Sequence, residues 1–384
     1  ELLNSLALLS GGKIAARQAK SLLPTYDIFD EARYFEPAAL NRPIKFGGAL
    51  IGLTICEDIW AGTELLPSRL LYRNNPAATL RARKASIVIN ASASPFYRGK
   101  SARRLKILSG LARKMRAHII YANQAGANDE LIFDGNSFAL APSGKVTARA
   151  KAFEEDLLLV DTDAPARALP PEHPEGPAEI CAALTLGIRD YFAKMGFKKA
   201  VLGLSGGIDS AVVAALAARA LGPENVTGVL MPSVYTSGQS NDDALELAGN
   251  LGIKAMMVPI RNIYGAFLKE LKAGDPLGEV SLTMQNLQSR SRGSILMALA
   301  NANGWLTLAT GNKSELAVGY CTLYGDTAGD MAPISDLFKT EVYKLADYLN
   351  EEEEVIPAAI ISRPPTAELK PGQKDQDDLP PYAT

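Results

Sequence analysis

A short glycine-rich segment between a strand and a helix constrains the fold of this sequence more than any other feature. The segment, residues 205–210, reads SGGIDS; it directly follows the apolar run 200–204 and leads into the Ala/Val-rich stretch 210–221. Two adjacent glycines allow a tight turn and a close approach of the backbone to a ligand. The helix that follows presents free N–H groups and the positive end of its dipole. The segment therefore predicts an anion-binding loop at the carboxyl end of a strand.

Asp209 is the unusual member of this loop, because a carboxylate repels a phosphate unless a cation lies between them. Magnesium is the cation we expect, since it binds carboxylate and phosphate oxygens together. The loop has no lysine, so it is not the common nucleoside-triphosphate loop. A plain helix start, capped by Ser or Asp side chains, is the alternative. The strand–loop–helix context favours phosphate binding.

The second half of the chain alternates strands and helices at a regular pace. Hydrophobic patterns predict strands at 200–204, 226–231, 255–259 and 305–309, and helices at 180–195, 210–221, 242–251 and 286–301. Such an alternation is typical of a parallel sheet with right-handed crossovers. Ligands of these sheets bind beyond the carboxyl ends of the strands, where residues 205–210 and 310–315 are expected to meet.

The first half is also α/β, although its pattern is less regular. Apolar and β-branched runs predict strands at 49–55, 87–90, 119–122, 138–140 and 157–160, a helix at 101–116, and a hairpin turn at 141–144. Residues 164–177 contain five prolines, which indicates a linker. A long surface loop within one domain is the alternative. We expect a first domain at 1–163 and a second at 178–384, with sequence missing at both ends.

Composition excludes several classes of function. Forty Lys and Arg residues balance 42 Asp and Glu residues, so neither a nucleic acid partner nor an anionic membrane is indicated. No apolar run approaches the ~20 residues of a membrane span. Three cysteines do not form a disulfide framework, which favours a reducing, cytoplasmic compartment. With only two histidines, the chemistry is expected to proceed without that residue.

The SGGIDS loop resembles that of the ATP pyrophosphatase (PP-loop) group, whose members bind ATP and transfer AMP to an oxygen of their substrate. Further segments narrow the resemblance: TGNKSE at 310–315, YGD at 324–326, GD at 329–330 and KT at 339–340. Together they resemble the NAD synthetase family over nearly all of residues 176–384. The resemblance implies a Rossmann-like domain that uses ATP as a co-substrate and Mg²⁺ as a cofactor.

The same resemblance assigns roles to individual residues. It implies ATP contacts at Ser205, Gly206, Gly207, Asp209, Ser210, Thr310, Lys339 and Thr366, and Mg²⁺ ligands at Asp209 and Glu315. It implies contacts to the deamidated dinucleotide at Arg290, Asp326 and Asp330, and a segment at 374–378 that folds over the site. In the implied reaction, the nicotinate carboxylate of deamido-NAD attacks the α-phosphate of ATP, and ammonia then displaces AMP.

The first half contains one cysteine at the end of a predicted strand. Cys56 ends the apolar run 49–55, where a lone cysteine is usually a small buried hydrophobic residue. Its context, KSLLPTY at 20–26 and NASASPF at 90–96, resembles the nitrilase (carbon–nitrogen hydrolase) superfamily over most of residues 2–163. The match is to the glutaminase domain that is fused to NAD synthetase. The resemblance implies an α-β-β-α sandwich and a Glu-Lys-Cys set of catalytic residues.

By this resemblance, Cys56 is the nucleophile and Lys20 stabilises the tetrahedral intermediate. Glu31 is an auxiliary carboxylate, and Tyr26 and Ser94 contact glutamine. The general-base glutamate of the family lies well upstream of the lysine, and only 19 residues precede Lys20. We interpret this as missing N-terminal sequence, with an inactive glutaminase as the alternative.

Together the two resemblances predict a ligase that makes NAD with glutamine as the amide donor, acts on small-molecule substrates and assembles as a homo-oligomer. Three alternatives stay open. The glutaminase half could be inert in an ammonia-only synthetase. Another PP-loop ATP pyrophosphatase, such as a tRNA-modifying enzyme, would need a basic face, which the net charge of -2 does not provide. A non-enzymatic relative would not need intact Cys56, Asp209, Glu315 and Lys339.

Overall fold

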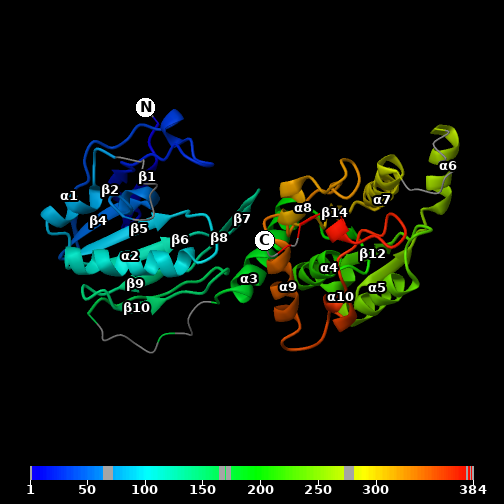
Figure 1. Cartoon of the computed structure of the whole chain (residues 1–384). Coiled ribbons are helices and arrows are strands. Elements are labelled where there is room, and N and C mark those ends of the chain that lie inside the picture. Colours follow the sequence, from blue (N-terminus) through cyan, green and yellow to red (C-terminus); the bar gives the residue numbers. More distant parts are fainter. Residues whose placement is uncertain are drawn as a thin grey trace. The chain divides into compact units, whose positions relative to one another are not determined.

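The computed structural model describes residues 2–63, 72–163, 169, 174–271, 281–377, 379–380 and 382. The chain divides into two compact units, Glu1–Gly176 and Pro177–Thr384, shown in Figure 1. Most of the expected linker, namely residues 164–168 and 170–173, lies outside the described residues. Its last residue, Pro177, is the first residue of helix α3 (Pro177–Met195), a position where the missing N–H of proline costs nothing.

A six-stranded sheet organises the first unit, with strand order β10-β9-β6-β5-β4-β3. The strands are β3 (Ile44–Phe46), β4 (Ala49–Ile55), β5 (Ile87–Ser92), β6 (His118–Asn123), β9 (Phe138–Leu140) and β10 (Val146–Arg149). Strands β4, β5 and β6 are parallel, and their outer neighbours pair antiparallel. Two hairpins lie outside this sheet: β1 (Ser5–Ser10) with β2 (Lys13–Ala19), and β7 (Ala125–Asn128) with β8 (Leu131–Asp134).

Helices α1 (Pro76–Ala82) and α2 (Lys100–Met115) pack on this sheet. Leu108, Ala112 and Met115 of α2 share a buried cluster with Ile119 and Leu140 of the strands. The apolar stripe that predicted a helix at 101–116 is thus the face that packs on the sheet. The turn expected at 141–144 joins β9 to β10 and is closed by the Gly144 N–H, which donates to the Ala141 carbonyl at 2.8 Å.

The strand expected at 157–160 was wrong. These residues belong to no strand or helix, and the side chains of Leu157 and Leu159 are 91% and 94% exposed. A continuous apolar run forms a strand only if a neighbouring strand pairs with its backbone, and no strand of the described residues pairs with this segment. The other four strands expected in this half are present as β4, β5, β6 and β9.

The second unit contains the parallel sheet that the alternation predicted, in the order β13-β12-β11-β14. Its strands are β11 (Ala200–Gly203), β12 (Val226–Leu230), β13 (Lys254–Met257) and β14 (Leu306–Leu308). The longer helices are α3, α4 (Ile208–Leu221), α5 (Gly238–Leu251), α6 (Arg261–Leu271), α7 (Leu282–Asn303) and α9 (Lys339–Leu349). Two short helices, α8 (Lys313–Val318) and α10 (Ala358–Ser362), complete the described set.

Both faces of this sheet are covered. Ala200 and Leu202 of β11 face a large cluster built with α3, α4, α5 and α9, whereas Val201 faces a second cluster that includes Leu296 and Ala300 of α7. Alternate residues of one strand therefore enter two different cores, as in doubly wound folds. No helix within the described residues is both long and apolar enough to cross a membrane.

Candidate active sites

The SGGIDS loop connects β11 to α4 as expected, and its hydroxyl groups organise its backbone. The Ser205 and Ser210 hydroxyls lie 3.1 Å apart, the Gly207 N–H donates to Ser205 Oγ at 3.2 Å, and Ser210 Oγ donates to the Gly207 carbonyl at 3.0 Å. Gly206 has φ of +75°, and a Cβ placed there would lie 2.3 Å from the carbonyl oxygen of Ser240. Only glycine fits this turn, because both the conformation and the space exclude a side chain.

The loop opens onto a cavity of about 380 Å³ at the carboxyl ends of β11, β12 and β14. The cavity has a second wall formed by residues 363–369, 373 and 375. Ten of the residues expected in the nucleotide and metal site line it, namely Ser205, Gly206, Gly207, Asp209, Ser210, Thr310, Glu315, Asp326, Lys339 and Thr366. Residues from distant parts of the sequence therefore meet around one concave space, the usual form of a ligand site.

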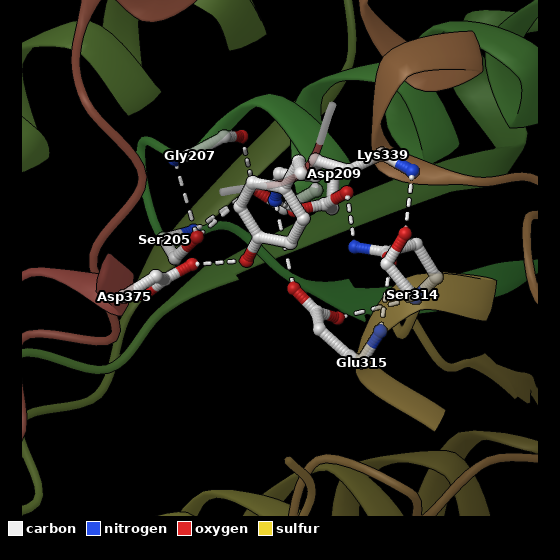
Figure 2. Close-up of polar contacts among 10 residues, drawn as sticks. Ser205, Gly207, Asp209, Ser314, Glu315, Lys339 and Asp375 are labelled. Atoms are coloured by element: carbon white, nitrogen blue, oxygen red, sulfur yellow. Dashed lines mark hydrogen bonds and ion pairs between the residues drawn. The ribbon is translucent and has the colours of Figure 1, made fainter. Parts of the chain in front are cut away.

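A partly buried charge cluster lies at the end of the loop (Figure 2). Lys339, which is 2% exposed, forms an ion pair with Asp209, and its Nζ lies 3.5 Å from Glu315 Oε1. Asn312 Nδ2 donates to Asp209 at 3.1 Å. Asn312 also caps α8, because its Oδ1 accepts from the Glu315 N–H at 3.1 Å. Two carboxylates and one ammonium thus face each other with their hydrogen bonds largely satisfied.

The two carboxylates raise the question of a metal. Burial, followed by the charge of Asp209, raises the pKa of Glu315 to about 7, whereas Lys339 lowers it. Burial opposes the charge of Lys339, but Asp209 and Glu315 outweigh it and raise the pKa of Lys339. No group of three or more metal-ligating side chains exists among the described residues. A pair of carboxylates beside a phosphate loop nevertheless fits Mg²⁺, which commonly takes one or two carboxylates and fills its shell with phosphate oxygens and water.

The C-terminal segment contacts this cluster. Tyr382 donates its hydroxyl to Asp375 at 2.8 Å, and Lys339 Nζ lies 5.6 Å from the centroid of the Tyr382 ring. Further along the wall, the Ser240 hydroxyl donates to Glu368 at 2.9 Å. Thr366 donates its hydroxyl to the Gln373 carbonyl at 2.6 Å, so the segment is also bonded to itself. Of the segment 374–378, which was expected to fold over the site, residue 378 lies outside the described residues.

Two residues expected to contact the dinucleotide are not among those that line the cavity. Arg290 Nε donates to the Leu323 carbonyl at 3.2 Å. Asp330 accepts from the Thr307 N–H at 2.7 Å and so holds the chain beside β14. A role for either in substrate binding stays a prediction. Asp326 does line the cavity, and its carboxylate accepts from the Thr322 N–H at 2.7 Å.

In the first unit, Cys56 immediately follows the carboxyl end of β4 and opens a short 3₁₀ turn, Cys56–Ile59. Its φ is +41°, which is unusual for a residue with a side chain and is found at functional turns. Burial raises the pKa of the Cys56 thiol, and the Lys20 ammonium opposes that rise. A lysine that stabilises the thiolate is an arrangement that activates a nucleophilic cysteine.

The other residues expected around Cys56 are held by polar partners. Lys20, 1% exposed, pairs with Glu31 at 2.6 Å. Tyr26 donates its hydroxyl to the Glu57 carboxylate at 3.1 Å. The Ser94 N–H donates to Asn123 Oδ1 at 3.0 Å, at the end of β6. Lys20, Glu31 and Tyr26 therefore lie on one loop system beside the Cys56 turn, whereas Ser94 approaches from the end of β5.

Several polar residues of this site were missed from the sequence. Glu57 is buried and also accepts from the Tyr72 hydroxyl at 2.8 Å. Asn90 is fully buried and donates to the Cys56 carbonyl at 3.4 Å. Burial lowers the pKa of Lys100 to about 8, and the nearby Arg104 contributes. The acidic pair that follows Cys56 was a usable signal, because two carboxylates at the end of an apolar strand require partners.

Comparison with known proteins agrees with this architecture. Residues 180–384 match the NAD synthase family, and residues 1–170 match the carbon–nitrogen hydrolase family. The chain is 48% identical to a glutamine-dependent NAD(+) synthetase of Synechocystis sp., with 100% of this chain and 69% of the relative aligned. It is 41% identical to the Thermotoga maritima enzyme of that description, over 99% of this chain and 71% of the relative.

A solved structure supports the same conclusion. A glutamine-dependent NAD+ synthetase from Acinetobacter baumannii, in complex with ADP, superposes with a TM-score of 0.87 at 38% identity, over 96% of this chain and 69% of that one. The fold and the two sites define a carbon–nitrogen ligase that combines a nitrilase-type domain with a PP-loop domain. More narrowly, the chain belongs to the glutamine-dependent NAD synthetase family.

Proposed function

We propose that this chain makes NAD from deamido-NAD and ATP, with glutamine as the nitrogen donor. The observation that carries the proposal is the cluster of Asp209, Glu315 and Lys339 at the SGGIDS loop, inside a cavity lined by most of the residues that the NAD synthetase resemblance assigns. The names of the relatives support the same reaction. The products are NAD, glutamate, AMP and pyrophosphate.

The synthetase half activates a carboxylate that is otherwise a poor acyl donor. The loop N–H group at Gly206, with the α4 N-terminus, binds the phosphates of ATP. Lys339 neutralises charge that develops as the nicotinate oxygen bonds to the α-phosphorus and pyrophosphate leaves. Asp209 and Glu315 would hold Mg²⁺, which would supply Lewis-acid stabilisation of the phosphate oxygens. Ammonia then attacks the acyl adenylate, and AMP departs.

The glutaminase half supplies that ammonia. The Cys56 thiolate attacks the side-chain amide carbon of glutamine, and Lys20 stabilises the oxyanion. The C–N bond breaks, ammonia leaves after taking up a proton, and a glutamyl thioester remains on Cys56. Water hydrolyses the thioester to glutamate and frees the thiol. Tyr26, Ser94 and Glu31 position the substrate around this centre.

Several broader assignments belong to the same proposal. We assign glutaminase activity to residues 1–163 and synthetase activity to 178–384, with 164–177 as the linker. A cytoplasmic location is supported by three free cysteines and by chemistry that needs reduced Cys56. We also propose a homo-oligomer, since synthetase domains of this family commonly associate.

The test is NAD formation from deamido-NAD and ATP with either glutamine or ammonia as the nitrogen source. NAD from both sources is the expected result. Product with ammonia alone would mean that the glutaminase half is inert. Failure to form NAD from either source would refute the proposed reaction. Omission of Mg²⁺, with restoration on its addition, tests the metal separately.

A further inference from the structure

One buried carboxylate bridges the segments that carry Lys20 and Cys56. Asp58 is 0% exposed, and both of its oxygens accept hydrogen bonds from backbone N–H groups. Oδ1 accepts from Ser21 and from Leu22, each at 2.9 Å. Oδ2 accepts from Ile55 at 3.0 Å. A carboxylate with three charge-assisted hydrogen bonds to main-chain donors is a strong and directional tie.

The N–H groups that donate to Asp58 lie next to the two proposed catalytic residues. Ser21 immediately follows Lys20, and Ile55 immediately precedes Cys56. Lys20 and Cys56 are 36 positions apart in the sequence (56 minus 20), yet the backbones beside them are bonded to the two oxygens of one side chain. Asp58 thus links the lysine-bearing segment directly to the nucleophile turn.

The Cys56 turn also needs external support. Its φ of +41° is disfavoured for a residue with a Cβ, so surrounding contacts must hold it. Asn90 also holds this turn, because its Nδ2 donates to the Cys56 carbonyl at 3.4 Å and to Thr54 Oγ1 at 3.0 Å. Its Oδ1 accepts from the Ser92 hydroxyl at 2.6 Å. Only Asp58 of these two reaches the segment after Lys20.

We propose that Asp58 is a positioning residue of the glutaminase site, which fixes the Lys20 ammonium relative to the Cys56 thiol by holding both backbones. The proposal rests on the proposed function, in that Lys20 and Cys56 are the pair that acts on glutamine. Asp58 itself forms no bond to substrate in this scheme. It determines how well the lysine stabilises the thiolate and the oxyanion, and small displacements at such a pair reduce rates about 100-fold.

The Asp58→Asn variant of the full chain tests the proposal. An amide has one acceptor oxygen, so its NH₂ group faces at least one buried N–H donor and the tie breaks on one side. We expect the rate constant for alkylation of Cys56 by iodoacetamide, followed by mass spectrometry of the Cys56 peptide, to fall at least tenfold. We expect kcat with glutamine to fall about 100-fold, while KM for glutamine and the ammonia-dependent rate stay within twofold.

The matched control is a variant that destabilises the cluster to which Ile59 belongs but leaves the Asp58 hydrogen bonds in place. Leu140 of β9 is fully buried, and two strands, β6 and β5, separate β9 from β4 in the sheet. Leu140→Ala should lower the melting temperature without a change in the Cys56 alkylation rate. Equal alkylation rates in Asp58→Asn and wild type, or an equal loss in Leu140→Ala, would overturn the assignment.

Two further readouts keep the test decisive. If Asp58→Asn does not fold, Asp58→Glu keeps both acceptor oxygens on a longer arm. Slower alkylation at an unchanged ammonia-dependent rate supports the assignment, and wild-type alkylation overturns it. Alkylation does not require glutamine hydrolysis, so a wild-type chain that cannot use glutamine would refute the proposed glutaminase reaction while the positioning role is still measured.

Discussion

Replacement of Gly206 by alanine should disable the phosphate loop through a clash that can be located to one atom. The new Cβ would lie 2.3 Å from the Ser240 carbonyl oxygen and 3.0 Å from both the carbonyl carbon and Cα of Ser240. These are backbone atoms at the start of α5, so no side-chain rotation relieves the contact. Either the loop or the first turn of α5 must move.

The free-energy cost of the Gly206→Ala substitution has two parts. A positive φ, here +75°, costs an L-residue about 1–2 kcal/mol, and forced overpacking costs about 1–3 kcal/mol. Their sum is about 2–5 kcal/mol. If the loop alone is destabilised by this amount, kcat/KM for ATP falls roughly 30- to 4,000-fold, since each ~1.4 kcal/mol is a factor of ten. If the whole unit absorbs it, the melting temperature falls by about 10 °C.

Gly304→Ala separates these two parts. Gly304 has φ of +65° and open space around the position of its Cβ, so it shares the conformational cost without the clash. The assay is ammonia-dependent NAD formation over a range of ATP concentrations, with thermal unfolding in parallel. Gly206→Ala should lose far more ATP-dependent activity than Gly304→Ala. Comparable losses in activity and in melting temperature would show that the contact with Ser240 has no effect.

Three other predictions concern single side chains. Cys56→Ala should abolish NAD formation with glutamine but leave the ammonia-dependent rate unchanged, and parallel loss of both rates would contradict separate sites. Asp209→Ala should abolish product from either nitrogen source at any Mg²⁺ concentration tested, whereas residual activity above 10% would exclude it as an essential ligand. Lys100→Met tests the pH dependence of stability. Burial lowers the folded-state pKa of Lys100 to about 8, below its ordinary 10.5. Between these two pH values the unfolded chain binds more protons than the folded chain, so folding stability rises with pH there. The free energy of unfolding of wild type, relative to Lys100→Met, should therefore increase by about 2 kcal/mol from pH 7 to 9.5; chemical denaturation at both values would reveal an unchanged difference, which would contradict the buried charge.

Much of the second unit follows from its sequence, because three of its strands, β11, β12 and β14, are almost completely buried and therefore form apolar runs. The helix expected at 286–301 begins four residues earlier, at Leu282, since Ser281 caps it by accepting from the Met284 N–H. Such an alternation favours parallel pairing, which the structure shows for all three strand pairs of this sheet. The strands of the first unit are harder to predict, because the β1–β2 hairpin has a weak apolar pattern. The run 157–160 also has no strand partner within the part of the chain that the structure describes.

The residues of the candidate sites also differ in how well the sequence predicts them. A contiguous loop such as SGGIDS can be located from spacing alone, since its glycines and hydroxyl groups are neighbours in the sequence as well as in the structure. Lys339 reaches Asp209 from 130 positions away, and nothing in the local pattern around Lys339 predicts that pair. Asp58 and Asn90 are still less visible, because a buried polar residue in an apolar run has no periodicity that reveals its partner.

Ser240 couples the phosphate loop to the C-terminal wall of the cavity. Its carbonyl oxygen lies where a side chain at position 206 would need to be, and its hydroxyl donates to Glu368 while accepting from Arg363. Four positions, 206, 240, 363 and 368, are therefore coupled through contacts of one serine. Substitutions among them should be non-additive and should drift together. If the SGGIDS hexapeptide were transferred alone to another Rossmann-like sheet, it would therefore not keep its geometry, because the contact with Ser240 would be missing.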